Sequence, residues 1–326
     1  MSKSSFYVGI DVGSQELVAA VEGRKPRSFK HSRGGITTMV KWVSKIAPEA
    51  SLHFCLEATG VYGYSVACCL YQEHHMSVSV INPAQIASYS RAQLRRTKTD
   101  NVDAQVILSF AQSQNPPLWE PESNSLRQLY YLVTEADRIR KAQRQWLNRK
   151  HCQRYLKDIP EIIKQADKTL ERVLYRQLKK IEQAIIELCQ THEDLRQDVQ
   201  LLCSIPGISN HSAVRILAYG KNALVDLNRN ALTAHAGLAP AQKQSGTSIK
   251  GKARIAKQGE RRLRTTLFMP ALAAAYHNPK LKIFYQRLLK NGKPKMLALV
   301  AVMKKLLLMI QAILKTKKPF KIQLST

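Results

Sequence analysis

Short apolar runs alternate with helical patterns through the first 117 residues. The runs are rich in β-branched and aromatic residues, which is typical of buried strands. They occupy residues 6–12, 17–21, 52–57 and 77–81. Helical patterns follow at 63–74 and 100–114, and Asn115-Pro116-Pro117 ends the second one. The alternation predicts an α/β layer fold over residues 1–117, and we expect a domain boundary there.

Residues 118–203 have a mainly helical pattern, which predicts an α-helical connector. Its apolar positions recur in steps of four and three, as in a coiled-coil seam. They are Leu174, Leu178, Ile181, Ile185, Leu188, Leu195, Val199 and Leu202. His192 is the polar member that would fix the register of the seam. The pattern slightly favours a coiled coil between two chains over a helix packed within its own domain.

Residues 204–326 are expected to form a mainly α-helical C-terminal domain. Near its start, Ile205-Pro206-Gly207-Ile208 resembles a helix-hairpin-helix turn, in which Gly207 would let backbone N–H groups approach a phosphate. An ordinary turn between helices is the equal alternative. Residues 297–314 are apolar but contain Lys304 and Lys305, so we expect a core helix and no membrane partner.

The formal net charge of +28 indicates the kind of partner that the protein binds. Residues 241–326 hold 20 Lys and Arg against one acid. Because these cations lie in patterned sequence, they favour nucleic acid over a solubilising or membrane-bound tail. The six cysteines have no zinc-ligand spacing, and no apolar signal precedes Phe6. We therefore expect a cytoplasmic protein with reduced thiols, associated with the nucleoid.

Four carboxylates are the candidate chemistry. Asp11 and Glu57 end two apolar strands, and Asp100 and Asp103 share one face of a helix. Each has a local alternative, such as a turn or a helix cap. Together, their order matches the RNase H/RuvC-like nuclease arrangement. Carboxylates prefer Mg²⁺, with Mn²⁺ as the alternative, and two such ions would activate the attacking oxygen and stabilise the leaving oxygen of a phosphodiester.

Basic residues flank this candidate site and recur near the C-terminal serine-glycine loop. Such residues would neutralise a phosphate backbone. The candidates for nucleic-acid binding are Arg91, Arg95, Arg96, Lys98, Gly207, Lys250, Lys252, Arg254, Lys257, Arg261 and Arg262.

Several motifs, taken together, resemble one known family. They are GIDVG at 9–13, CLEATGVYG at 55–63, INPAQ at 81–85, RRTKTDNVDA at 95–104, SIPGIS at 204–209, AGLAP at 236–240 and QSGTSIKGKARIAKQGERRLR at 244–264. In order and spacing the chain resembles the DEDD transposases of the insertion-sequence-110 type, which include pilin-gene invertases. The RRTKTD form is closest to the insertion-sequence-1111 subgroup.

The resemblance implies a RuvC-like domain, a coiled-coil connector and a C-terminal transposase domain. It implies that Asp11, Glu57, Asp100 and Asp103 bind metal and that Ser245 is the nucleophile. The implied partners are donor DNA, target DNA and a structured noncoding bridge RNA. The implied assembly is a homo-oligomer, namely a dimer that becomes a tetramer in the synaptic complex.

From the residues alone, Ser245 is more often a turn residue than a nucleophile, and Ser248 is its nearest competitor. Because Ser245 lies far along the chain from the four acids, the active site would be completed by chain folding or by a second chain. The alternatives are a DNA invertase of the same family, a hydrolytic junction nuclease without serine catalysis, and a non-catalytic nucleic-acid-binding protein.

Overall fold

A computed structural model gives two compact units, Met1–Pro121 and Glu122–Thr326. It describes all residues except 1–4, 95–98, 242–243, 246–248, 251–253 and 322–326. The division falls a few residues after the boundary expected at residue 117. Residues 122–203 of the expected connector belong to the second unit, together with the C-terminal helices.

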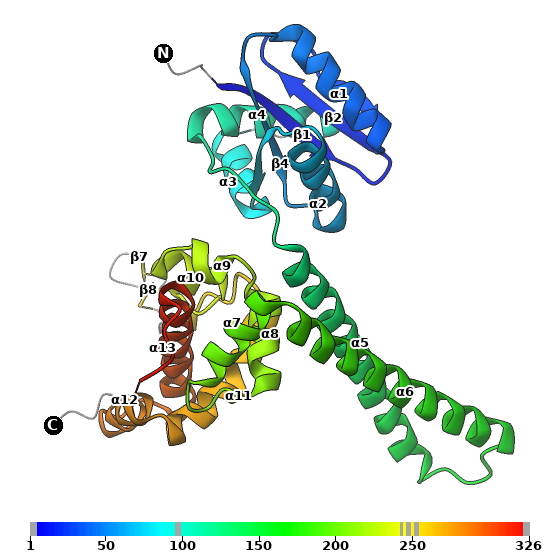
Figure 1. Cartoon of the computed structure of the whole chain (residues 1–326), viewed down its shortest axis with the longest axis vertical. Coiled ribbons are helices and arrows are strands. Elements are labelled where there is room, and N and C mark those ends of the chain that lie inside the picture. The colour runs from blue at the N-terminus through cyan, green and yellow to red at the C-terminus, as the bar shows by residue number, and fades with distance from the viewer. Residues whose placement is uncertain (1–4, 95–98, 242–243, 246–248, 251–253, 322–326) are drawn as a thin grey trace. The chain divides into compact units, whose positions relative to one another are not determined.

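The first unit is built on one mixed five-stranded sheet (Figure 1). Its strands are β1 (Ser5–Val12), β2 (Glu16–Val21), β3 (Arg27–Lys30), β4 (Ser51–Glu57) and β5 (Ser77–Ile81), in the order β3-β2-β1-β4-β5. The strand β1 runs antiparallel to β2 and parallel to β4. The four apolar runs form the expected strands. The strand β3 was not expected, because Phe29 is its only buried residue.

Helices cover both faces of this sheet. They are α1 (Arg33–Ile46), α2 (Gly60–Cys68) with the π-helical turn η1 (Cys69–Glu73), α3 (Pro83–Ala92) and α4 (Asp100–Gln114). Val8 and Ile10 of β1 pack in one core cluster with residues of α1 and α2. Residues 7, 9 and 11 of β1 alternate to the opposite face, which α4 covers. The helix α3, with Ile86 as its only buried residue, was missed from the sequence.

The second unit is mainly helical. Its helices are α5 (Asn124–Gln153), α6 (Glu161–Thr191), α7 (Glu193–Cys203), α8 (Asn210–Gly220), α9 (Ala223–Asp226), α10 (Arg229–His235), α11 (Arg261–His277), α12 (Pro279–Lys290) and α13 (Lys295–Thr316). Two short ladders pair β6 (Pro240–Ala241) with β9 (Arg254–Ile255), and β7 (Gln244–Ser245) with β8 (Ile249–Lys250). Of the described helices, α13 alone is long and apolar enough to cross a membrane. It packs into the core of this unit, where Leu306 and Ile310 are fully buried.

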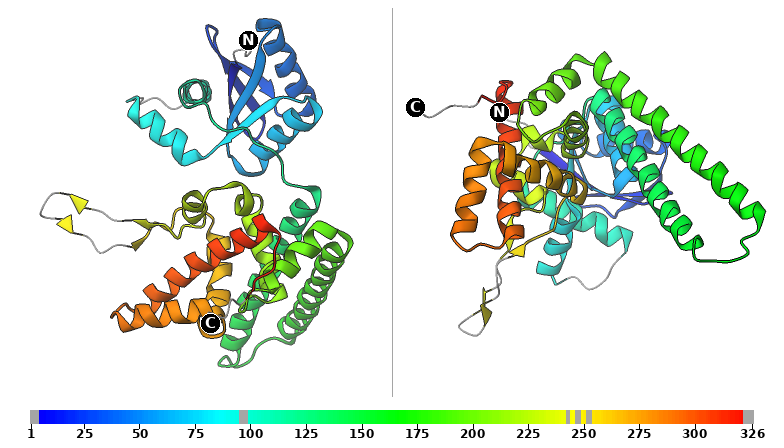
Figure 2. Two further views of the ribbon diagram at one scale, coloured as in Figure 1. Left: turned by 60° about the vertical axis from the view of Figure 1, so that its left-hand side comes forward. Right: turned by 90° about the horizontal axis from the view of Figure 1, so that it is seen from below.

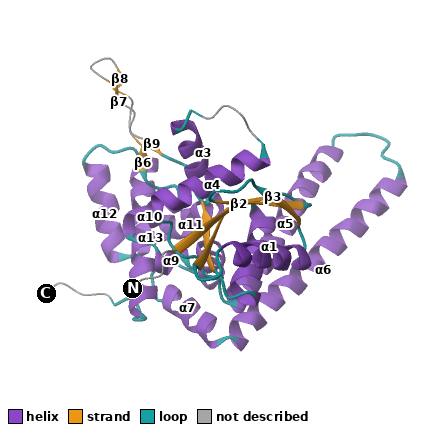
Figure 3. Ribbon diagram, turned by 90° about the horizontal axis from the view of Figure 1, so that it is seen from above, coloured by secondary structure: helices purple, strands orange, loops and turns teal. Residues whose placement is uncertain are grey.

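The helices α5 and α6 form an antiparallel hairpin (Figure 3). Arg140 of α5 donates to Glu182 at 2.7 Å, and Lys150 donates to Glu171 at 2.9 Å. The expected seam does not continue through one helix, because α6 ends and α7 begins at His192. Beyond this break, the seam residues Leu195, Val199 and Leu202 enter the core of the second unit. The prediction that His192 fixes a coiled-coil register is therefore wrong.

A charged network joins the base of this hairpin to α8. Asp137 of α5 accepts hydrogen bonds from Arg140 at 3.2 Å, from the Tyr219 hydroxyl at 2.6 Å, and from Arg215. Arg262, at the start of α11, lies 5.6 Å from the Tyr219 ring and donates to Thr134 at 3.2 Å. These side chains tie three helices together around one half-buried carboxylate.

Candidate active site

The sheet places Asp11 and Glu57 side by side. The strands β1 and β4 are parallel and neighbouring, and Ile10 pairs with Leu56, so the next residues lie at the same level. Side chains alternate along a strand, so Glu57 shares its face with Cys55, which packs against α4 residues. Both acids therefore project at the carboxyl ends of adjacent strands, on the face that α4 covers.

Gly9 brings α4 into contact with the sheet. A Cβ atom at Gly9 would lie 2.4 Å from both the Ala104 carbonyl oxygen and the Leu108 nitrogen. The main chains of strand and helix thus touch, which a larger residue would prevent. Asp100 and Asp103 occupy the first turn of α4, one turn before this contact.

The N-terminus of α4 is capped by Thr99, whose side chain accepts a hydrogen bond from Val102 N at 3.4 Å. The capping role considered for Asp100 therefore falls to its neighbour. Asp100 is exposed and Asp103 is half-buried at the end of the helix that faces Asp11. Both acids remain available to the site.

The four acids interact electrostatically around Asp11. Burial and, to a smaller extent, the charges of Asp100, Asp103 and Glu57 together raise the pKa of Asp11 to about 6. A hydrogen bond from the Val12 backbone opposes this shift. Such a cluster of carboxylate oxygen donors fits a hard divalent cation. In the described part of the chain, however, no three His, Cys, Asp or Glu side chains lie in an arrangement that could hold a metal ion as they stand.

The raised pKa of Asp11 predicts that the stability of the metal-free protein falls as the pH rises. Because the folded state holds this proton more tightly, the group's stabilising contribution is full below about pH 4 and is lost as the pH rises through 6. We expect Asp11→Asn to unfold at a higher temperature than the wild type at pH 7 in chelator, with the difference vanishing near pH 4. Glu49→Gln, at an exposed site, is the control. A variant no more stable than wild type at pH 7 would contradict this prediction.

The basic residues expected beside the acids are only partly described. Arg91 is exposed on α3, where its guanidinium donates to the Ala87 carbonyl and the Ser88 hydroxyl, both at 3.2 Å. The other expected members, Arg95, Arg96 and Lys98, lie outside the described residues. Their role toward nucleic acid stays a prediction.

Ser245 lies in the second unit, in a segment that extends from the helices (Figure 2). Its backbone pairs with Ile249, and the neighbouring Lys250 pairs with Gln244. The side chains of Ser245, Lys250 and Arg254, and the whole of Lys252, are outside the described part of the chain. Lys257, Arg261 and Arg262 follow on exposed positions, and Arg262 also contacts the Asp137 network.

Gly207 has a packing role in the turn between α7 and α8. Its φ is +106°, and an added Cβ would lie 2.6 Å from Ala274 N on α11. Ile205 and Ile208 on either side are buried. This close approach to α11 accounts for the glycine without a phosphate, so nucleic-acid binding by Gly207 stays a prediction.

Sequence reasoning missed two features. Gly9 was read only as part of a motif, although a glycine inside an apolar strand signals a close approach of another backbone. The Asp137 network had no such signal, because its partners Arg215 and Tyr219 lie about eighty positions away in the chain.

A central strand acid, a neighbouring strand acid and two acids on the covering helix have the order expected of a DEDD-type nuclease domain on an RNase H-like sheet. A DEDD transposase family model matches residues 8–157, and a model of the IS116/IS110/IS902 transposase family matches residues 199–286. The chain therefore belongs to the IS110/IS116/IS902 family of transposases, which are DNA-cutting enzymes. Its DEDD domain implies a divalent metal ion.

Three relatives support this assignment. The pilin gene-inverting protein of Moraxella bovis is 29% identical over 326 residues, covering 98% of each chain. The protein of the same name from Moraxella lacunata is 29% identical over 325 residues with the same coverage. An uncharacterized insertion element IS110 protein of Streptomyces coelicolor is 30% identical over 115 residues, which are 35% of this chain and 28% of the relative.

Proposed function

We propose that this transposase cuts and rejoins DNA strands with Asp11, Glu57, Asp100 and Asp103 as metal ligands and Ser245 as nucleophile. The observation that carries the proposal is the pKa of Asp11, which burial and the three neighbouring carboxylates raise to about 6. An acid held in this way is stabilised when a cation binds. Two Mg²⁺ ions at the four acids would supply charge stabilisation for the reacting phosphate.

In the proposed reaction, the Ser245 oxygen bonds to a backbone phosphorus atom while the bond from phosphorus to a deoxyribose oxygen breaks. The serine proton passes to solvent or a base, and the released oxygen takes up a proton to become a hydroxyl. A hydroxyl of a second strand then attacks the phosphoserine and regenerates the serine. One phosphoester replaces another at each step, so rejoining requires no ATP. Lys250, Lys252 and Arg254 would hold the adjacent backbone.

The proposed partners are donor DNA, target DNA and a structured bridge RNA that pairs with both. We propose a homo-oligomer, as the family resemblance implies. The four acids and Ser245 belong to different units of the chain. The site is then completed either within one chain or by a second one. Similarity to pilin gene-inverting proteins over nearly the whole chain supports inversion as a second outcome of the same chemistry.

The decisive experiment is capture of the covalent intermediate. The protein is purified with its bound RNA, the RNA is sequenced, and the complex is incubated with Mg²⁺ and end-labelled DNA of the element end. We expect a DNA–protein adduct that survives denaturation and maps to Ser245 by mass spectrometry. Ser245→Ala should abolish the adduct, because it removes the attacking oxygen.

Ser248→Ala is the matched control and should retain the adduct. Normal strand exchange by Ser245→Ala would contradict the nucleophile assignment. Cut DNA without any adduct would instead identify a hydrolytic nuclease. Recovery of no discrete RNA would contradict guiding by RNA.

A further inference from the structure

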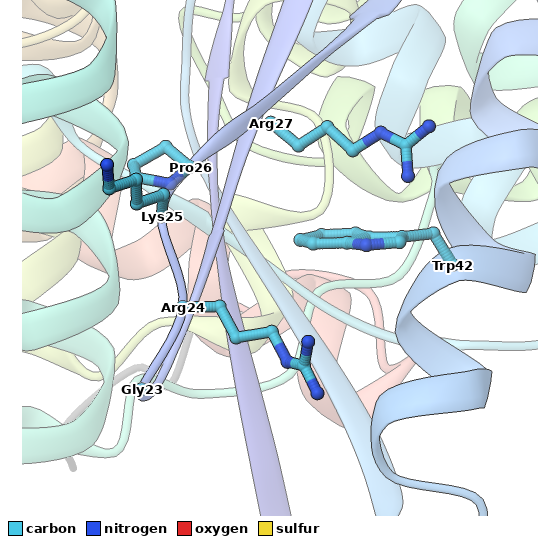
Figure 4. Close-up of a pocket in the computed structure, with 6 residues that line it drawn as sticks. All are labelled: Gly23, Arg24, Lys25, Pro26, Arg27 and Trp42. Carbon is cyan, nitrogen blue, oxygen red and sulfur yellow. The ribbon is translucent and has the colours of Figure 1, made fainter.

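A basic cavity lies at the turn between β2 and β3, apart from the four acids. Gly23, Arg24, Lys25, Pro26, Arg27 and Trp42 line it, with a volume of about 500 Å³. Figure 4 shows the Trp42 ring edge-on between the guanidinium groups of Arg27 and Arg24. The Arg27 guanidinium carbon is 6.0 Å from the Trp42 ring centre. We call Arg24, Lys25, Arg27 and Trp42 the Trp42 patch.

No acid in the described ranges forms a salt bridge with the three cations of this patch. The salt bridge described in the first unit joins Arg33 to Glu73. The acid next to the turn, Glu22, accepts a hydrogen bond from Gln112 at 2.9 Å. Lys41, also exposed, precedes Trp42 in α1. The patch therefore combines unpaired positive charge with a half-exposed aromatic ring.

The sheet register separates the patch from the four acids. Val18 of β2 pairs with Asp11, whereas Val21 pairs with Val8, so the turn after β2 lies at the other end of β1. Trp42 packs against Phe29 in the cluster on the α1 face, whereas the acids lie on the α4 face. A nucleic-acid segment bound at the patch is therefore distinct from the phosphodiester that the four acids of the same unit would hold.

We propose that the Trp42 patch binds an unpaired polynucleotide strand, with one base stacked on Trp42 and the flanking phosphates on Arg24 and Lys25. Aromatic stacking requires an exposed base face, which the inside of a duplex does not offer. Phosphates on both sides of a stacked base require nearby cations, and Arg24, Lys25 and Arg27 line the same cavity as Trp42. The cavity also falls within the ~300–1,000 Å³ range of ligand clefts.

The test uses the full-length protein and fluorescent 12-nucleotide strands of uridine and of thymidine, with a 12-base-pair DNA duplex for comparison. We expect Trp42→Leu to weaken binding of the unpaired strands about 10-fold and of the duplex by less than twofold. This corresponds to the lower part of the ~1–3 kcal/mol measured for one stacked base. Trp42→Phe should retain most of the affinity. Neither substitution of Trp42 changes the charge of the protein, so its non-specific electrostatic attraction to nucleic acid stays constant.

Tyr276→Leu, at an exposed aromatic of the second unit, is the matched control and should bind like wild type. Tighter binding of the uridine strand would identify RNA as the source of the bound strand, and tighter binding of the thymidine strand would identify displaced DNA. Equal weakening of duplex and single strands by Trp42→Leu, or no weakening at all, would overturn the proposal.

A cross-linking experiment locates the contact and does not depend on the folding of the Trp42 variant. Strands carrying 5-iodouracil should cross-link to Trp42 on irradiation, as read by peptide mass spectrometry. Arg24→Gln/Lys25→Gln, which changes the turn alone, should reduce this adduct several-fold. Lys280→Gln/Lys282→Gln removes the same charge from exposed positions of α12 and should leave it unchanged. Cross-links confined to other residues would overturn the proposal.

This inference stands apart from the proposed strand chemistry. Asp11→Asn protein should retain the Trp42 cross-link, because the acids lie at the other end of β1. Loss of recombination with an intact cross-link would thus concern the acids, and loss of the cross-link with intact recombination would concern the patch.

Discussion

Replacing Gly9 with alanine is expected to separate α4 from the sheet and to lower the free energy of unfolding by about 3 kcal/mol, the upper part of the overpacking range. The added methyl group would lie 2.4 Å from main-chain atoms of Ala104 and Leu108. No side-chain rotation relieves a contact with two backbone atoms, so the whole helix must move. Scanning calorimetry of the full chain would measure the loss.

Gly34→Ala is the matched control for this substitution. Gly34 lies in α1, and a Cβ there meets no atom within 4 Å. Alanine at this helical position should stabilise the protein by up to about 1 kcal/mol. A Gly9→Ala protein within 1 kcal/mol of wild type would show that the strand and helix do not touch at this point.

Replacing Asp11 with asparagine is expected to reduce strand cutting by about a thousandfold, which corresponds to roughly 4 kcal/mol of lost transition-state stabilisation. Asparagine retains the size of the side chain but removes the charge at the centre of the four acids. The same change should remove the rise in unfolding temperature that Mg²⁺ gives to the wild type. Cutting assays on labelled DNA and thermal melts with and without Mg²⁺ measure the two effects.

Glu49→Gln, on the exposed turn before β4, should cut DNA and respond to Mg²⁺ like the wild type. The thermal melts are informative even if the cutting assay requires an RNA that is lost on purification. An unchanged Mg²⁺ response in Asp11→Asn would place the metal elsewhere in the protein.

The sequence predicted the central strands because apolar residues dominate each of these short segments. It missed β3 and α3, each of which contributes a single buried residue, and it also missed α1, which buries four. The order of Asp11, Glu57, Asp100 and Asp103 along the chain predicted one nuclease domain. The distances between these acids in the fold could not be predicted, because they depend on how closely Gly9 lets α4 approach the sheet.

The break at His192 was hidden from pattern analysis for a different reason. The apolar steps of four and three continue from Leu188 through Leu195, and no proline or glycine marks a helix end. The backbone nonetheless becomes extended at His192, because the following residues pack with the C-terminal helices. Tertiary packing therefore overrode a regular local pattern.

The α5–α6 hairpin is attached to the rest of the second unit at its base. Asp137 of α5 binds Arg215 and Tyr219 of α8, whereas α6 has no fully buried residue along its length. Arg262 contacts the Tyr219 ring of the same network from the first turn of α11, which directly follows the segment that includes Ser245. The start of α11 is therefore anchored to the hairpin by side-chain contacts.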